Sequence, residues 1–145
     1  MMESVGTIVI NTSPDKVFRF VAHGENFPQW ARGTRVVNLS EGSFGDGTLI
    51  SHRGQVVVRV SHVQLNQGFE TESIRIHFPA RFVVKHTHGM VQFEPVGQET
   101  QITLKEQVEL TPFMKPFEHL LAKKAQQERQ AALEQLKTLL EHKKE

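Results

Sequence analysis

A run of β-branched residues with period-two alternation, residues 34–110, constrains the fold of this chain more than any other sequence feature. Breaks that contain Gly or Pro divide the run, and they are too short to hold the crossover helix that parallel pairing requires. The run therefore predicts an antiparallel meander. The six predicted strands are residues 34–41, 48–53, 55–65, 69–78, 80–94 and 99–110. Residues 5–11 predict a seventh strand, and Gly54 is compatible with either a break between strands or a bulge.

Helical signals flank the β run on both sides. Ser13, Pro14 and Asp15 are typical of a helix start, because serine caps, proline suits the first turn and an acid complements the dipole. A second short helical turn is predicted over residues 25–30. After the last strand, apolar or small residues recur at steps of three or four, which predicts one helix from about residue 117 to about residue 142. The predicted stripe comprises Phe117, Leu121, Ala125, Glu128, Ala132, Leu136 and Leu139.

Composition narrows the classes of protein that this chain can represent. Its 145 residues suit one domain, residues 1–145. A formal charge of +1 gives no positive excess for a phosphate backbone, so nucleic acid is not an expected partner. The absence of cysteine excludes disulfides and thiolate chemistry. The first residues lack a signal-peptide pattern, and no stretch approaches the roughly 20 apolar residues of a membrane span, so we expect a cytoplasmic protein.

Several segments resemble a known superfamily. Residues 10–18 read Ile-Asn-Thr-Ser-Pro-Asp-Lys-Val-Phe, and residues 25–30 read Glu-Asn-Phe-Pro-Gln-Trp. These segments resemble the opening of START-related (SRPBCC) proteins, in particular the polyketide cyclase/dehydrase and lipid-transport members. Residues 93–97, Phe-Glu-Pro-Val-Gly, and residues 133–137, Leu-Glu-Gln-Leu-Lys, are similar to the last hairpin and final helix of that group. All of these are scaffold motifs and none is a catalytic signature.

The resemblance implies an α+β helix-grip fold. In that fold a curved, seven-stranded antiparallel sheet wraps around a long C-terminal helix, and two short helices lie between strands 1 and 2. An apolar cavity between sheet and helix is implied, with a lipid-like, aromatic or polyketide-like ligand and no cofactor. Members include cyclases, binding and transport proteins and chaperone co-factors, so the fold alone does not select a function.

The closing helix itself favours a cavity. Ala125, Glu128 and Ala132 replace large side chains in the middle of its stripe, and small residues leave space unless a large sheet residue fills it or the helix is partly exposed. Trp30 is either a residue at the pocket entrance or an anchor for the second short helix. The predicted ligand-binding residues are Trp30, Val58, Val60, Ile74, Ile76, Phe82, Val84, His88, Met90, Leu104, Phe113, Phe117, Leu121, Ala125, Glu128 and Ala132.

Glu106 is the first candidate for chemistry. It shares its strand parity with Ile102, Leu104 and Val108, so its carboxylate is predicted to point to the apolar side. A buried carboxylate is costly unless it is paired, which makes Glu106 a candidate general acid or base. The alternative is a carboxylate at the cavity mouth that is wetted or bonded to a neighbouring Arg or His.

Three histidines are further candidates. His86 and His88 share one strand face, and His62 shares a parity with the preceding valines, so each is predicted to line the cavity unless Gly89 marks a bulge. His86 and His88 with Glu94 also form part of a cupin-like metal pattern. The spacing of that pattern is wrong and its upstream glycine signature is missing, so no metal site is predicted.

Three functions are compatible with these features. The favoured one is non-covalent binding of an apolar small molecule for sequestration, transport or presentation. The second is a cyclase/dehydrase-type enzyme, with Glu106 and either His86 or His62 as acid and base. The third is a protein-interaction module that resembles activators of the Hsp90 chaperone. An enzyme needs two titratable groups in the cavity within mutual reach, whereas a carrier needs only an apolar lining and an opening.

Overall fold

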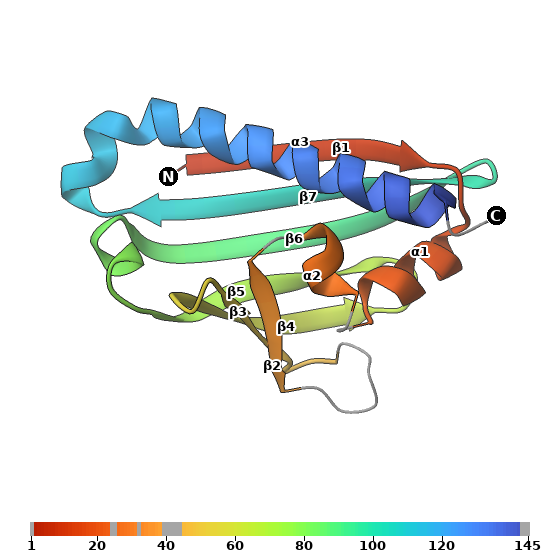
Figure 1. Ribbon diagram of the computed structural model, residues 1–145, viewed down its shortest axis with the longest axis horizontal. Helices are drawn as coiled ribbons and strands as arrows, with labels where there is room; N and C mark the ends of the chain where they lie inside the picture. Colours follow the sequence, from red (N-terminus) through yellow and green to blue (C-terminus); the bar gives the residue numbers. More distant parts are fainter. Residues whose placement is uncertain (1, 24–25, 32, 39–44, 143–145) are drawn as a thin grey trace.

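A long helix lies across an antiparallel sheet in the computed structural model of this protein, which describes residues 2–23, 26–31, 33–38 and 45–142 (Figure 1). The strands are β1 (Met2–Ile10), β2 (Thr34–Asn38), β3 (Leu49–His52), β4 (Val56–Gln64), β5 (Gly68–Ile76), β6 (Val84–Val96) and β7 (Glu99–Leu110). The helices are α1 (Pro14–Val21), α2 (Phe27–Trp30) and α3 (Glu118–His142), with two 3₁₀ helices, η1 (Ala80–Phe82) and η2 (Pro112–Phe117).

The strands form one sheet in the order β1-β7-β6-β5-β4-β3-β2, and every neighbouring pair is antiparallel. This topology confirms the predicted helix-grip fold. The predicted break at Gly54 is a turn between β3 and β4, in which the Gln55 N–H donates to the His52 carbonyl at 3.1 Å. The end of the first predicted meander strand, residues 39–41, and most of the break at residues 42–47 lie outside the described residues.

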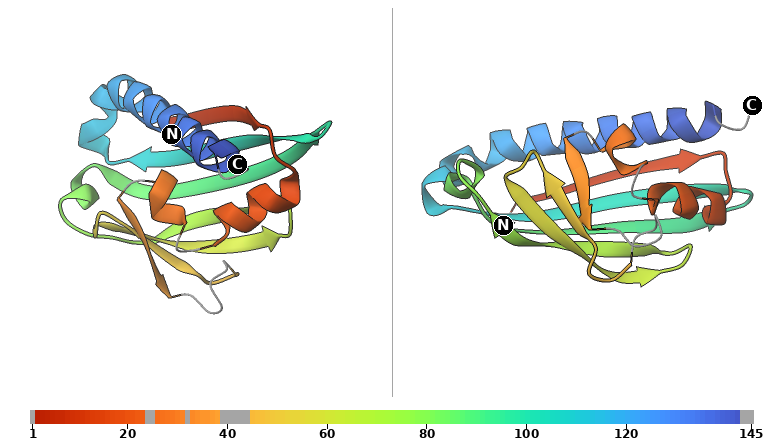
Figure 2. Two further views of the ribbon diagram at one scale, coloured as in Figure 1. Left: turned by 45° about the vertical axis from the view of Figure 1, so that its right-hand side comes forward. Right: turned by 60° about the horizontal axis from the view of Figure 1, so that its bottom comes forward.

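The helix α3 packs mainly on the edge strand β1 and less on β7 (Figures 1 and 2). Gly6 of β1 makes this contact close, because a Cβ atom at that position would lie 2.9 Å from Leu133 Cδ1 and 3.3 Å from Arg129 Cβ. Val5 donates its N–H to Gln126 Oε1 at 2.9 Å, and the Gln126 amide nitrogen donates back to the Val5 carbonyl. The edge strand β1 is therefore held against α3 by both close packing and hydrogen bonds.

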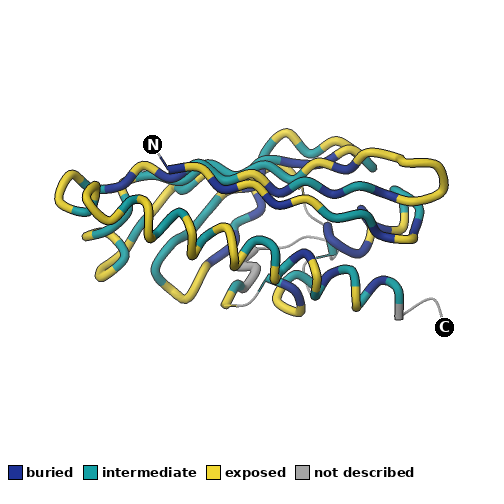
Figure 3. The backbone as a smooth tube through the Cα atoms, turned by 90° about the horizontal axis from the view of Figure 1, so that it is seen from above, coloured by how far each residue is buried: buried dark blue, intermediate teal, exposed yellow. Residues whose placement is uncertain are grey.

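Two apolar cores lie between the sheet and the helices. The main core surrounds the C-terminal half of α3 and includes α1, α2 and one end of the sheet. The small core lies at the other end and comprises Met2, Val108 and Leu110, with Val83, Val84, Met114, Leu121, Ala122 and Ala125 packed against them. Figure 3 shows the buried residues distributed along the sheet and the facing side of α3.

The buried stripe of α3 differs from the predicted one. Leu133, Leu136 and Leu140 are buried, whereas Phe117 is 51% exposed and Glu128 is also exposed. The physical reason is that the close approach to Gly6 turns the face of Leu133 toward the sheet. Spacing alone cannot choose between adjacent stripes when small and polar residues occur in both.

Local geometry explains three smaller differences. The fifth strand of the predicted meander, residues 80–94, starts only at Val84, because residues 80–82 form η1 after Pro79. The long helix begins at Glu118, since Pro116 lies in the preceding η2 segment. Ser13 occupies the N-cap of α1 but its hydroxyl donates to Asp15 Oδ1 at 2.6 Å instead of capping, and this bond holds the pKa of Asp15 below its usual value.

Candidate functional site

The inner face of the sheet, the face toward α3, is defined by the strand register. Ile102, Leu104 and Val108 of β7 are buried on this face. Residues directly opposite each other in an antiparallel pair lie on the same face. The strand pairing therefore identifies the inner residues of each neighbouring strand. The inner residues of β6 are Thr87, Gly89, Val91 and Phe93. The inner residues of β5 include Phe69 and Thr71, and those of β4 include Val58 and Val60.

Part of the inner face is only half buried, and we call it the open patch. Because α3 packs mainly on β1, it does not cover the middle strands at this point (Figure 1). The open patch comprises Val56, Val58, Thr71, Ser73, Ile76 and Thr87, all of intermediate exposure. Ser73 Oγ also accepts the Thr87 N–H at 2.9 Å, just beyond the last paired residues of β5 and β6. The patch therefore combines three aliphatic side chains with three hydroxyls.

An ion pair borders the open patch on the α3 side. Glu106 lies on the inner face of β7, as its parity predicted, and its Oε1 accepts a hydrogen bond from Arg129 Nη2 of α3 at 2.6 Å. The two side chains are 29% and 28% exposed. Charge-assisted hydrogen bonds of this length are among the stronger polar contacts in proteins. The predicted alternative of a carboxylate bonded to a neighbouring Arg is the arrangement that the structure contains.

His52 borders the open patch on the opposite side. It ends β3 directly opposite Val56, and it shares its parity with the buried Ile50, so its imidazole lies on the inner face. His52 is not among the site residues predicted from the sequence, although the alternation in β3 was the signal that could have identified it. Arg129 was missed as well, although it stands four residues after Ala125 and therefore on the same side of α3.

The surroundings of His52 lower its pKa. Partial loss of hydration among the surrounding protein atoms is the largest cause, although His52 as a whole is exposed to solvent. The positive charges of Arg53 and Arg129 also lower this pKa, whereas the negative charges of Glu106 and Glu128 raise it. His52, Glu106 and Arg129 thus act on one another electrostatically across the inner face. The neutral imidazole is favoured in the folded protein.

This shift predicts a pH dependence of stability. Because the folded-state pKa of His52 lies below its unfolded value of about 6.5, the unfolded chain binds the proton more readily as the pH falls through that value. Acidification from about pH 7.5 to about pH 5.5 should therefore lower the free energy of unfolding of the unchanged protein. The same acidification should lower the free energy of unfolding of the His52→Gln variant by a smaller amount. Urea denaturation of both proteins at the two pH values tests this. Equal losses in both proteins would contradict the assignment.

The other predicted histidines lie on the outer face, so their predicted inward placement is wrong. A β-bulge between Val84 and His86 reverses the alternation of β6. The imidazole of His86 therefore lies 3.0 Å from Glu72 Oε1, and that of His88 lies 2.9 Å from Glu70 Oε1. Met90, opposite Lys105, is on the outer face for the same reason. The bulge lies at the start of β6 and not at Gly89.

The predicted placement of His62 is also wrong. Its backbone has a left-handed φ of 53° within an irregular part of the β4–β5 pairing. The imidazole Nδ1 lies 3.2 Å from Glu70 Oε2, on the outer face. The structure therefore does not bring His62 or His86 to the face on which Glu106 lies.

The remaining predicted lining residues fall into four groups. Val58 and Ile76 belong to the open patch, and Val60 and Leu104 lie deeper in the main core. Val84, Leu121 and Ala125 pack in the small core, and Ala132 packs against the main core. Five others are exposed and do not line the inner face: Ile74 at a bulge in β5, Phe82, Phe113, Phe117 and Glu128.

Trp30 is an anchor of the main core. It is 3% exposed, its ring centroid lies 5.1 Å from that of Phe27, and its indole Nε1 finds no hydrogen-bond partner among the described residues. This environment agrees with the alternative in which Trp30 packs the second short helix. A place at an entrance is contradicted by its burial.

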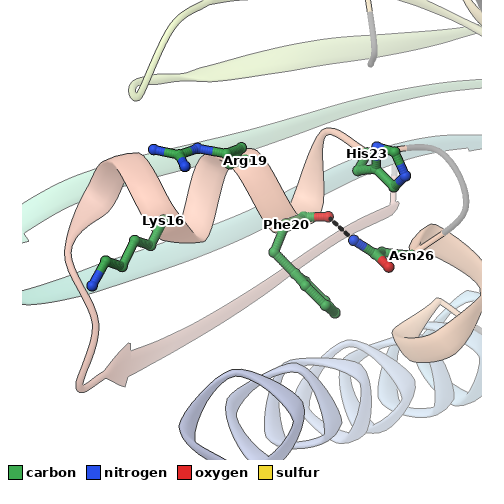
Figure 4. Close-up of a pocket in the computed structure, with 5 residues that line it drawn as sticks. All are labelled: Lys16, Arg19, Phe20, His23 and Asn26. Atoms are coloured by element: carbon green, nitrogen blue, oxygen red, sulfur yellow. Dashed lines mark hydrogen bonds between the residues drawn. The ribbon is translucent and has the colours of Figure 1, made fainter. Parts of the chain in front are cut away.

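A separate groove of about 350 Å³ lies beside α1 (Figure 4). It is lined by Lys16, Arg19, Phe20, His23 and Asn26, and the Asn26 side chain donates to the Phe20 carbonyl at 3.2 Å. Figure 4 shows the ring of Phe20 directed toward α3, and most of the surface that lines the groove is apolar. No residue of the open patch takes part in it. We assign the candidate site to the inner face, because half-exposed aliphatic side chains lie there beside the Glu106–Arg129 ion pair.

Two further properties bound the chemistry of the described residues. Within residues 2–23, 26–31, 33–38 and 45–142, no group of three or more His, Asp or Glu side chains is arranged to hold a metal ion. In the same part of the chain, no helix is both long and apolar enough to cross a bilayer.

Comparison with known structures defines the class of fold. A START superfamily protein from Mycobacterium smegmatis has a TM-score of 0.73 at 16% identity, over 98% of this chain and 99% of that chain. A protein from Mesorhizobium loti has a TM-score of 0.73 at 14% identity, over 97% of each chain. A protein from Thermus thermophilus has a TM-score of 0.63 at 18% identity, over 94% of each chain. At these identities the likeness shows a shared START-type fold.

The sequence also identifies the family. The family model described as polyketide cyclase / dehydrase and lipid transport matches residues 1–141. The chain belongs to this family. No protein of curated function matches it significantly. Family and fold together support a role in binding a hydrophobic ligand.

Proposed function

We propose that this protein binds a small, largely apolar molecule on the open patch and sequesters, carries or presents it. The observation that carries this proposal is the half-exposure of Val56, Val58 and Ile76 on the inner face of the sheet. Water in contact with aliphatic side chains on a concave protein face is released when an apolar ligand covers them, which favours binding by about 25 cal/mol per Å² of apolar area. A lipid, an aromatic compound or a polyketide-like molecule meets this requirement.

The polar border of the patch indicates the orientation of the ligand. Glu106 and Arg129 already satisfy part of each other's hydrogen-bonding capacity, and each retains some exposed surface. A hydroxyl, carbonyl or carboxylate of the ligand can bond to that exposed part without leaving a buried charge unpaired. The apolar body would then cover the aliphatic side chains, with the polar group toward the ion pair.

A second candidate is a cyclase/dehydrase-type enzyme with a different acid–base pair from the predicted one. Glu106 and His52 both lie on the inner face, and the lowered pKa of His52 keeps its imidazole available as a base near neutral pH. Binding is favoured over catalysis because the Glu106 carboxylate is held in an ion pair with Arg129.

The substitution Glu106→Gln separates the two functions. For a carrier, we expect uptake of a fluorescent fatty acid to stay within about threefold of the unchanged protein, because the amide keeps the shape and hydrogen-bonding capacity. For an enzyme, turnover of the compound that co-purifies should fall by about 10²–10⁴-fold. Glu109→Gln, on the outer face of the same strand, is the matched control and should change neither quantity.

The proposal of ligand binding has its own test. Mass spectrometry of the protein purified under native conditions should detect an apolar compound that is released on denaturation. Absence of such a compound, together with absence of fatty-acid uptake at micromolar concentrations, would contradict it.

A further inference from the structure

The end of the molecule formed by η1, η2 and the first turn of α3 exposes a cluster of large apolar side chains, which we call the apolar tip. Phe78 is 66% exposed, Phe82 56%, Phe113 59%, Phe117 51% and Leu120 67%. These are five of the nine large apolar side chains that are exposed in the described part of the chain. Scattered exposed apolar residues are ordinary, but a group that shares one end of a molecule is typical of a docking surface.

Two segments far apart in the sequence build the apolar tip. Phe78 and Phe82 pack edge to face with ring centroids 5.2 Å apart. Thr111 joins this segment to η2, because its N–H donates to the Val83 carbonyl at 3.0 Å and its hydroxyl to the Phe82 carbonyl at 2.5 Å. Both 3₁₀ helices lie at the left end in Figure 1, and both views of Figure 2 keep them side by side.

The two segments that contain these apolar side chains also carry a net positive charge. Residues 77–85 and 111–124 contain five basic side chains, Arg81, Lys85, Lys115, Lys123 and Lys124, and one acidic side chain, Glu118. The formal charge of the two segments is therefore +4, whereas the whole chain carries +1, so the rest of the chain is net acidic. All five basic residues are exposed, and none forms an ion pair with another described residue.

We propose that the apolar tip docks on a negatively charged lipid surface. Aromatic rings suit the boundary between headgroups and acyl chains, and each lysine or arginine near an anionic membrane strengthens binding by about fivefold. The charge distribution favours this occupant over a second copy of the chain, because two tips with like charge would repel each other. Docking here places the small core, and not the polar outer face of the sheet, next to the lipid.

Vesicle co-sedimentation tests the proposal with the unmodified chain of 145 residues. Vesicles of phosphatidylcholine alone are compared with vesicles of equal parts phosphatidylcholine and phosphatidylglycerol. The unchanged protein should sediment with the mixed vesicles and much less with phosphatidylcholine alone, and added salt should weaken the binding. The double variant Phe78→Ser with Phe113→Ser should bind the mixed vesicles at least about tenfold more weakly, and Lys115→Glu at least about fivefold more weakly.

Matched controls lie away from the apolar tip. Leu65→Ser removes an apolar side chain that is 75% exposed at the β4–β5 turn, and Lys16→Glu reverses a charge on α1. Both should bind the mixed vesicles within about twofold of the unchanged protein. Circular dichroism should be the same for all variants, because each substituted side chain is exposed.

The proposal is wrong if the unchanged protein does not sediment with the mixed vesicles, or if the controls lose as much binding as the tip variants. It is also wrong if the protein is a dimer in size-exclusion chromatography that the tip variants convert to monomers, without vesicle binding. Ligand uptake on the inner face is measured separately with the fluorescent fatty acid. Failure of the two proposals is therefore distinguishable.

Discussion

Leu136→Ala should lower the free energy of unfolding by about 2–5 kcal/mol. The Leu136 side chain is fully buried in the main core, where α3 meets the sheet and the two short helices. Removing it deletes apolar contacts and leaves a cavity that the surrounding core fills only in part. Urea denaturation measured by circular dichroism gives the change directly.

Phe117→Ala is the informative control for this prediction. A stripe drawn from spacing alone places Phe117 and Leu136 on the same face, whereas Phe117 is 51% exposed in the structure. Its truncation should therefore cost less than about 1 kcal/mol. Comparable losses from the two substitutions would contradict the buried face assigned to α3.

Val58→Arg should abolish ligand uptake, with a loss of at least about a hundredfold in affinity for a fluorescent fatty acid. Val58 is one of the three aliphatic side chains of the open patch and also packs against the main core, so the substitution either fills the space of the ligand or leaves a guanidinium beneath its apolar body. Because Val58 is only half buried, the new side chain can reach water in the empty protein and the fold should persist.

Val57→Arg provides the matched control for ligand uptake. Val57 is the preceding residue of the same strand, has the same intermediate exposure and lies on the outer face, opposite Arg75. We expect uptake to remain within about threefold of the unchanged protein. Equal loss of uptake in both variants would show that the open patch is not the binding site.

Strand parity predicted side-chain placement where the strand is regular and failed where it is not. In β7 the pairing with β1 and β6 continues without an irregularity from Thr100 to Val108, and Glu106 lies on the inner face as expected. In β6 a single bulge before His86 moves His86, His88 and Met90 to the outer face. A bulge of this kind depends on the partner strand, so alternation within one strand cannot reveal it.

The ion pair at the site depends on tertiary structure. Glu106 and Arg129 are 23 residues apart and meet only because α3 folds back over the sheet. The sequence indicated that a buried carboxylate needs a partner, but the identity of that partner follows from the rotation of α3 about its axis. Gly6 sets part of this rotation by allowing close contact with Leu133 and Arg129. No local pattern near Glu106 contains that information.

Methyl NMR of the protein during titration with a fatty acid tests ligand binding on the inner face most directly. The methyl signals of Val56, Val58 and Ile76 should shift and saturate together, because these three side chains line the open patch. The methyl signals of Val57, on the outer face of the same strand, should move little. If instead Val57 shifts as much as Val58, or if the largest shifts arise in α1 beside the groove at Lys16 and Arg19, the ligand does not bind to the open patch.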